Sequence, residues 1–113
     1  MNKVYRGADK TKKVKLQALR RQYELLSMTN QEYIADYFNR IQTLVNAMKA
    51  CKGELTNQQI IDKVLRTLTL HFDHIVVAIK ESKDLDSMKV EELQNSLEAH
   101  EQRVNERRKG EKA

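Results

Sequence analysis

Apolar residues recur along this chain three and four positions apart, which is the spacing of one face of an α-helix. In the segment Val64–Leu85, one such face carries the bulky residues Phe72, Ile75, Val76 and Ile79. A longer stripe after Thr29 consists of Ile34, Tyr37, Phe38, Ile41, Leu44, Val45 and Met48. This periodicity predicts amphipathic helices that bury their apolar sides against one another, with the longest stripe on the central helix.

The residues that flank the stripes predict where each helix begins and ends. The predicted helices cover, in order, about residues 9–27, 29–53, 56–68, 72–82 and 87–108. Thr29-Asn-Gln-Glu32 and Thr56-Asn-Gln-Gln59 both match a capping box, in which side chains of the first and last residues satisfy free backbone N–H groups. Gly53 is expected to end the second helix, because glycine readily adopts the left-handed conformation common at helix C-termini.

Composition supports an all-α fold, a compact bundle of about five helices. The chain of 113 residues contains no proline and only three glycines, which favours helices with short connectors over a β-sandwich. Its length predicts at most one domain. We expect a helical domain over residues 9–108, a basic and frayed N-terminus over residues 1–8, and a disordered tail over residues 109–113.

Positive charge is concentrated at the N-terminal end of the chain. Residues 1–21 contain eight Lys or Arg residues against the single acid Asp9, a net charge of +7, whereas the rest sums to −2 because the whole chain carries +5. Such a segment can contact phosphate backbones, although a solvated helix face is the simpler interpretation. The candidate nucleic-acid contacts are Lys10, Lys12, Lys13, Lys15, Arg20 and Arg21.

The fifth predicted helix carries a narrow seam at heptad spacing, made of Leu93, Leu97, His100 and Val104. A seam with so few repeats favours docking against another helix over a long coiled coil. It is the candidate surface for self-association, together with the second helix, and a homo-oligomer is expected.

Residues capable of chemistry do not form a recognisable site. His71 and His74 provide too few ligands for a metal ion, and Cys51 has no catalytic partners in the sequence. The sequence therefore predicts no enzyme, no cofactor, no metal and no small-molecule substrate. No apolar run approaches the ~20 residues that span a bilayer, so no membrane partner is expected. The lone cysteine fits a reducing interior, cytoplasmic or nuclear.

Several segments, taken together and in register, resemble the Gag polypeptide of plant copia-type LTR retrotransposons. They are Lys13–Glu24, Asp36–Arg40, Lys63–Leu68, Phe72–Ile79, Glu81–Leu85 and Leu97–Glu101. Order and spacing agree from about Tyr5 to Arg108. The resemblance implies a capsid-type, all-helical structural protein that self-associates into particles enclosing the element's RNA. The alternatives are a sequence-independent nucleic-acid-binding protein that uses the basic N-terminal helix, and a degenerate or domesticated Gag relic with a host interaction.

The chain departs from the family pattern at several points. It is expected to be a fragment truncated at both ends, which lacks an upstream helical region and stops before the family's zinc knuckle. Thr69-Leu70 stands where the family usually carries proline, so this connector is expected to be less rigid. Lys89 replaces the small hydroxyl residue expected to cap the last helix, and Ser87 is the substitute cap.

Overall fold

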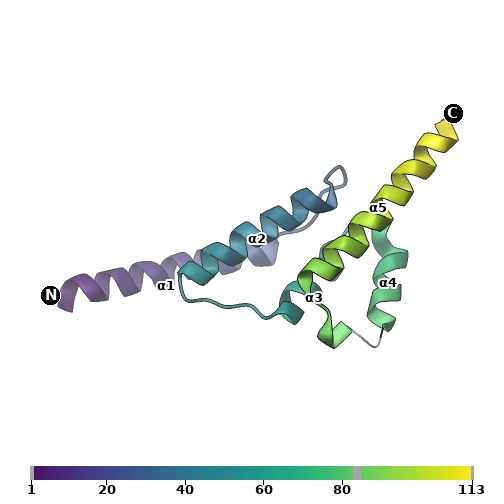
Figure 1. Cartoon of the computed structure of the whole chain (residues 1–113). Coiled ribbons are helices and arrows are strands. Elements are labelled where there is room, and N and C mark those ends of the chain that lie inside the picture. Colours follow the sequence, from purple (N-terminus) through teal and green to yellow (C-terminus); the bar gives the residue numbers. More distant parts are fainter. Residues whose placement is uncertain (1, 83–84, 113) are drawn as a thin grey trace. The chain divides into compact units, whose positions relative to one another are not determined.

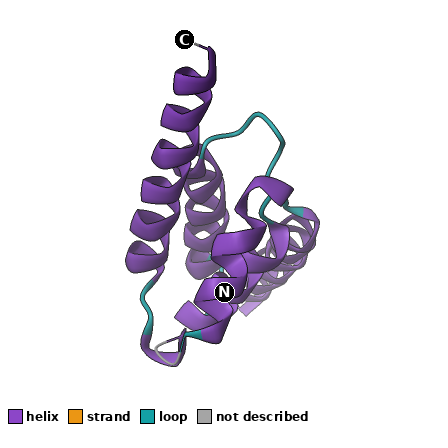
Figure 2. Cartoon of the chain, turned by 90° about the vertical axis from the view of Figure 1, so that its right-hand side faces the viewer, coloured by secondary structure: helices purple, strands orange, loops and turns teal. Residues whose placement is uncertain are grey.

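A computed structural model describes residues 2–82 and 85–112, with side chains for residues 10–82 and 85–106. Within these ranges the chain forms five α-helices and two short 3-10 helices, and no strand (Figures 1 and 2). The elements are α1 (Asn2–Leu25), α2 (Ile34–Ala50), α3 (Asn57–Thr67), η1 (Leu70–Phe72), α4 (Asp73–Glu81), η2 (Leu85–Ser87) and α5 (Val90–Lys112). The all-α prediction is confirmed.

The described residues group into two compact units. Unit 1 contains residues 2–26 and 39–55, and unit 2 contains residues 27–38, 56–82 and 85–112. The backbone of α1 already begins at Asn2 and that of α5 continues to Lys112, so both helices are longer than predicted. The side chains of residues 1–8 and 109–113 lie outside the described part, and the predicted frayed ends stay predictions.

Unit 1 is built from α1 and the later turns of α2. The apolar stripe of α1, made of Leu16, Leu19 and Tyr23, is half-buried, as is Leu26 directly after the helix. Val14 and Leu25, on the opposite side of α1, are 65% and 75% exposed. The stripe of α2 is covered more fully, since Ile41 and Met48 are buried. Two helices can cover only part of each other's apolar surface, so α1 keeps an apolar side that is partly exposed.

The C-terminus of α2 corrects the prediction for Gly53. The residue in the left-handed conformation is Lys52, with φ 65°, whereas Gly53 has no positive φ. Gly53 N–H donates to the Met48 carbonyl at 2.8 Å and Lys52 N–H donates to the Lys49 carbonyl at 3.0 Å, which is the Schellman pattern. Gly53 instead leaves space for a neighbour, because a Cβ there would require the Leu16 side chain to shift and would lie 3.3 Å from the Met48 carbonyl oxygen.

Unit 2 has its core between α3 and α5, which pack against each other. Val64 of α3 and Leu93 and Leu97 of α5 are fully buried. The predicted capping box of α3 is confirmed: the Thr56 hydroxyl accepts from Gln59 N–H at 3.1 Å, and the Gln59 side chain accepts from Thr56 N–H at 2.8 Å.

A polar contact joins the first turn of α2 to the end of α3 inside unit 2. The Tyr37 hydroxyl is hydrogen-bonded to the Thr67 hydroxyl. Thr67 gives its single hydroxyl proton to the Lys63 carbonyl at 2.6 Å, so Tyr37 is the donor to Thr67. Lys63 itself is only 5% exposed, and Met28 is also buried. The apolar stripes did not predict burial of either residue.

The connector between α3 and α4 has a backbone that already suits proline at position 69. Thr69 has φ −70° and ψ 167°, close to the value that a proline ring imposes. Leu68, with φ −69° and ψ 153°, lies in the extended region that residues before proline prefer. The Thr69 carbonyl accepts a hydrogen bond from Phe72 N–H at 3.1 Å. A proline at position 69 would keep this carbonyl and therefore this hydrogen bond.

We therefore expect the Thr69→Pro variant to be stabilised by about 0.4–1 kcal/mol, because proline restricts the unfolded chain at a position where the folded backbone needs no change. Urea unfolding followed by circular dichroism measures the difference. A Thr69→Pro protein less stable than the wild type would contradict this description of the connector.

Candidate functional site

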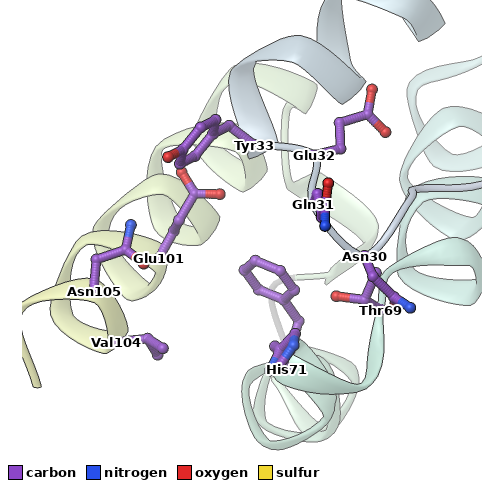
Figure 3. Close-up of a pocket in the computed structure, with 10 residues that line it drawn as sticks. Asn30, Gln31, Glu32, Tyr33, Thr69, His71, Glu101, Val104 and Asn105 are labelled. Atoms are coloured by element: carbon purple, nitrogen blue, oxygen red, sulfur yellow. The ribbon is translucent and has the colours of Figure 1, made fainter. Parts of the chain in front are cut away.

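A cavity of about 290 Å³ lies in unit 2. Three segments line it: the turn before α2, the connector that contains η1, and the second half of α5 (Figure 3). In Figure 3, Glu101, Val104 and Asn105 project from α5, and His71 faces them from the connector. Buried Phe72 contributes an apolar wall, and the remaining lining residues are Asn30, Gln31, Glu32, Tyr33 and Thr69.

The turn that borders this cavity differs from the predicted capping box of the second helix. Thr29 N–H donates to the Glu32 carboxylate at 3.2 Å, but Glu32 N–H donates to the Thr29 carbonyl at 3.1 Å, which closes a separate turn. The helix α2 begins later, at Ile34. At its start Tyr37 N–H donates to the Tyr33 carbonyl at 3.0 Å. The predicted start at Thr29 is therefore wrong.

A residue of α5 instead provides a hydrogen-bond acceptor for a free backbone N–H group at the start of α2. Ile34 N–H, one of the four N–H groups that a helix leaves unpaired at its start, donates to the Glu101 carboxylate at 2.8 Å. This partly buried bond joins residues 67 positions apart in the sequence. Glu101 therefore holds the beginning of α2 against α5, and its carboxylate also suits the positive end of the helix dipole.

Removing this acceptor is expected to destabilise unit 2. The Glu101→Ala variant leaves the Ile34 N–H group without its partner, and a buried unsatisfied donor costs about 1–3 kcal/mol. Glu101→Gln keeps an oxygen acceptor at the same place and should lose less than half as much. Chemical denaturation of both variants measures the difference, and equal losses would show that the acceptor oxygen is not what stabilises the start of α2.

A second hollow, of about 610 Å³, adjoins the first and shares Tyr33, Glu101 and Asn105 with it. We call the two hollows together the acidic groove. Its carboxylates are Glu32, Asp36, Glu98, Glu101 and Glu106. Neither Lys nor Arg is among the described residues that line it, although the chain as a whole has 21 basic residues against 16 acidic ones.

The sequence prediction missed the acidic groove, although part of its signal was present. Glu98, Glu101 and Asn105 are three and four positions apart, so they lie on one face of α5. Tyr33, which the sequence prediction did not assign to a site, is 58% exposed at the junction of the two hollows. The contribution of the turn and of the connector required the three-dimensional structure.

The six predicted nucleic-acid contacts are all exposed on α1: Lys10, Lys12, Lys13, Lys15, Arg20 and Arg21. Residues 10–21 contain no Asp or Glu. By helical spacing, Lys10, Lys13, Val14, Gln17 and Arg21 share the side opposite the half-buried apolar stripe. We call this set the basic face. The structure therefore gathers basic side chains on solvent-facing positions, and RNA binding by them stays a prediction.

The predicted self-association seam on the fifth helix needs correction. Leu93 and Leu97 have no exposed surface, because α5 packs them into the core with α3, so they cannot form a docking surface in the folded chain. His100 is half-buried, with its ring 5.8 Å from the Phe72 ring, and Val104 is half-buried at the wall of the first hollow.

The residues with the most reactive side chains belong to different units: Cys51 to unit 1, and His71 and His74 to unit 2. Cys51 is half-buried near the end of α2, and His71 and His74 are both exposed. Among the side chains of residues 10–82 and 85–106, no group of three or more His, Cys, Asp or Glu is arranged to hold a metal ion. No helix in the described ranges has the length and apolar character needed to cross a membrane.

Comparison with known proteins places this all-helical chain in a family. The family model for the gag polypeptide of LTR copia-type matches residues 1–110, nearly the whole chain. Neither a curated protein nor a solved structure matches. The match agrees with the resemblance read from the segments between Lys13 and Glu101. The chain belongs to the family of gag polypeptides of copia-type LTR retrotransposons.

Proposed function

We propose that this chain is a structural Gag module that associates with further copies of itself, with no catalytic step of its own. Its family is that of a retrotransposon structural polypeptide. The observation that carries self-association is the apolar side of α1, where Leu16, Leu19 and Tyr23 are only half-buried, as is Leu26 directly after the helix. Exposed apolar patches commonly mark sites of protein association.

A hollow in unit 1 extends this apolar surface. It has a volume of about 380 Å³ and is lined by Leu26 of the chain following α1, by Leu44 of α2 and by the side chains of Gln22, Asn39, Arg40 and Thr43. An apolar side chain from a second copy would displace water from this hollow, and burial of apolar area is the main favourable term in most protein association. Unit 1 is therefore the expected centre of the assembly contact.

Light scattering on purified protein freed of nucleic acid tests the proposal. We expect the mean mass to rise above that of one chain at tens of micromolar, and to stay above it at high salt because salt does not screen apolar contacts. Leu19→Lys should lower the degree of association, because Leu19 belongs to this apolar side and is half-buried. Val76→Lys on α4 is the matched control, since Val76 is also half-buried and lies in unit 2. A strict monomer at every concentration would refute self-association.

A second candidate function is sequence-independent binding of RNA through α1. It is favoured by the exposure of six basic side chains in a stretch without acids. Arginine and lysine on one helix contact phosphates without reading bases, and such binding weakens steeply with salt. Both functions are compatible, because a shell that packages RNA must bind it as well as assemble.

A further inference from the structure

We propose that the acidic groove of unit 2 binds the basic face of α1 from a second copy of the chain. The inference rests on the proposed self-association and adds to it a defined contact between unlike surfaces. The two surfaces have opposite charge: five carboxylates line the groove, and the basic face carries the exposed side chains of Lys10, Lys13 and Arg21 without an acid.

The groove has the chemistry of a site for long basic side chains. Its carboxylates accept hydrogen bonds from ammonium and guanidinium groups. The exposed ring of Tyr33, at the junction of the two hollows, offers a face for a cation. Phe72 and Val104 supply apolar surface for the methylene stem of a lysine or arginine.

The basic face of α1 presents groups that match these features. Lys10, Lys13 and Arg21 extend along one side of the helix, where they can reach carboxylates spread over the groove. Val14 lies between them and is 65% exposed, an apolar side chain on an otherwise polar surface. It matches the apolar wall that Phe72 and Val104 form in the first hollow.

Such a contact joins two different surfaces, so it is heterologous. The basic face of each bound copy leaves that copy's own acidic groove open for the next chain. A heterologous contact forms a ring where the rotation closes, and an open chain of copies where it does not. Electrostatic attraction should make association faster and salt-sensitive, unlike the apolar contact of unit 1.

Charge exchange between two variants tests the proposal. The acid-face variant carries Asp36→Lys and Glu106→Lys, both at exposed positions, and retains Glu101 because that residue holds the start of α2. The base-face variant carries Lys10→Glu, Lys13→Glu and Arg21→Glu. The matched control carries Glu54→Lys and Glu81→Lys, exposed acids outside the groove with the same change in charge. Sedimentation velocity on RNA-free protein measures association, and circular dichroism confirms folding.

We expect each variant alone to associate at least tenfold more weakly than wild type at low salt, and the control to be unchanged. Mixing the acid-face and base-face variants should restore association, because their reversed charges are complementary. If wild type associates but both variants match it, the groove contact is refuted while self-association stands. If wild type is a monomer, the proposed function itself fails. If the variants lose association but mixing does not restore it, a direct contact between the two surfaces is refuted.

Discussion

Replacing Leu97 by alanine is expected to lower the free energy of unfolding by about 2–5 kcal/mol, the range seen when a fully buried leucine is truncated. Leu97 has no exposed surface and lies on the side of α5 that packs against α3. The loss combines the lower hydrophobic transfer energy with the cavity that the remaining side chains cannot fill. Denaturant unfolding monitored by circular dichroism measures it.

Leu70→Ala is the matched control, since it makes the same chemical change at a position that is 83% exposed in η1. Its effect should stay within about 0.5 kcal/mol. The pair of variants separates two interpretations of the fifth helix. If Leu97→Ala left the unfolding free energy unchanged and weakened association instead, Leu97 would lie on a surface between copies, and the packing of α5 against α3 would be wrong.

The error over Leu97 shows what helical spacing can and cannot establish. The four-residue interval between Leu93 and Leu97 correctly predicted that both face an apolar environment. It carried no information on whether that environment is another part of the same chain or another copy. The structure answers this for α5 because α3 contacts it, and α3 is separated from α5 in sequence by a connector and a further helix.

Helix starts were predictable where the capping residues are neighbours in sequence. The Thr56–Gln59 box contains both of its partners within four residues, and the structure confirms it. The start of α2 was not predictable in this way, because the acceptor for Ile34 N–H is a carboxylate 67 residues away. Thr29 and Glu32 have the right residue types, but they close a turn ahead of the helix.

The end of α2 illustrates a different limit. Glycine at position 53 correctly marked the end of the helix, but the reason inferred for it was the wrong one. Lys52 adopts the left-handed conformation that glycine usually adopts at this point. Gly53, which has no side chain, instead leaves space for the side chain of Leu16. Sequence alone cannot separate a glycine chosen for its backbone conformation from one chosen for the absence of a side chain.

The acidic groove could be predicted only in part, because its carboxylates come from segments that are distant in the sequence. Spacing places Glu98 and Glu101 on one face of α5, but Glu32 and Asp36 reach the same groove from the turn and first turn of α2. The basic residues of α1, in contrast, lie so close together in the sequence that their clustering can be recognised without a structure. A local charge cluster is thus readable from sequence, and one assembled from distant segments is not.

Reversing the charge of Lys12, Lys13 and Lys15 to Glu is expected to reduce affinity for single-stranded RNA by about tenfold or more at low salt, and to lower the slope of log affinity against log salt by about 2. All three side chains are exposed on α1. Each phosphate that a lysine neutralises releases bound counterions, so the change in slope reports how many phosphates the variant no longer neutralises. Fluorescence anisotropy with a labelled RNA of mixed sequence, repeated at several salt concentrations, measures both quantities.

The control for this experiment carries Lys49→Glu, Lys89→Glu and Arg103→Glu, which changes net charge equally at exposed positions outside α1. If the two triple variants lost affinity and slope to the same extent, binding would reflect the total charge of +5 rather than a contact through α1. If only the α1 variant did so, RNA and the acidic groove of a second copy would both use basic residues of α1. Lys13 belongs to both sets, so RNA binding and the groove contact would then compete for it, and added RNA should weaken the salt-sensitive part of the association.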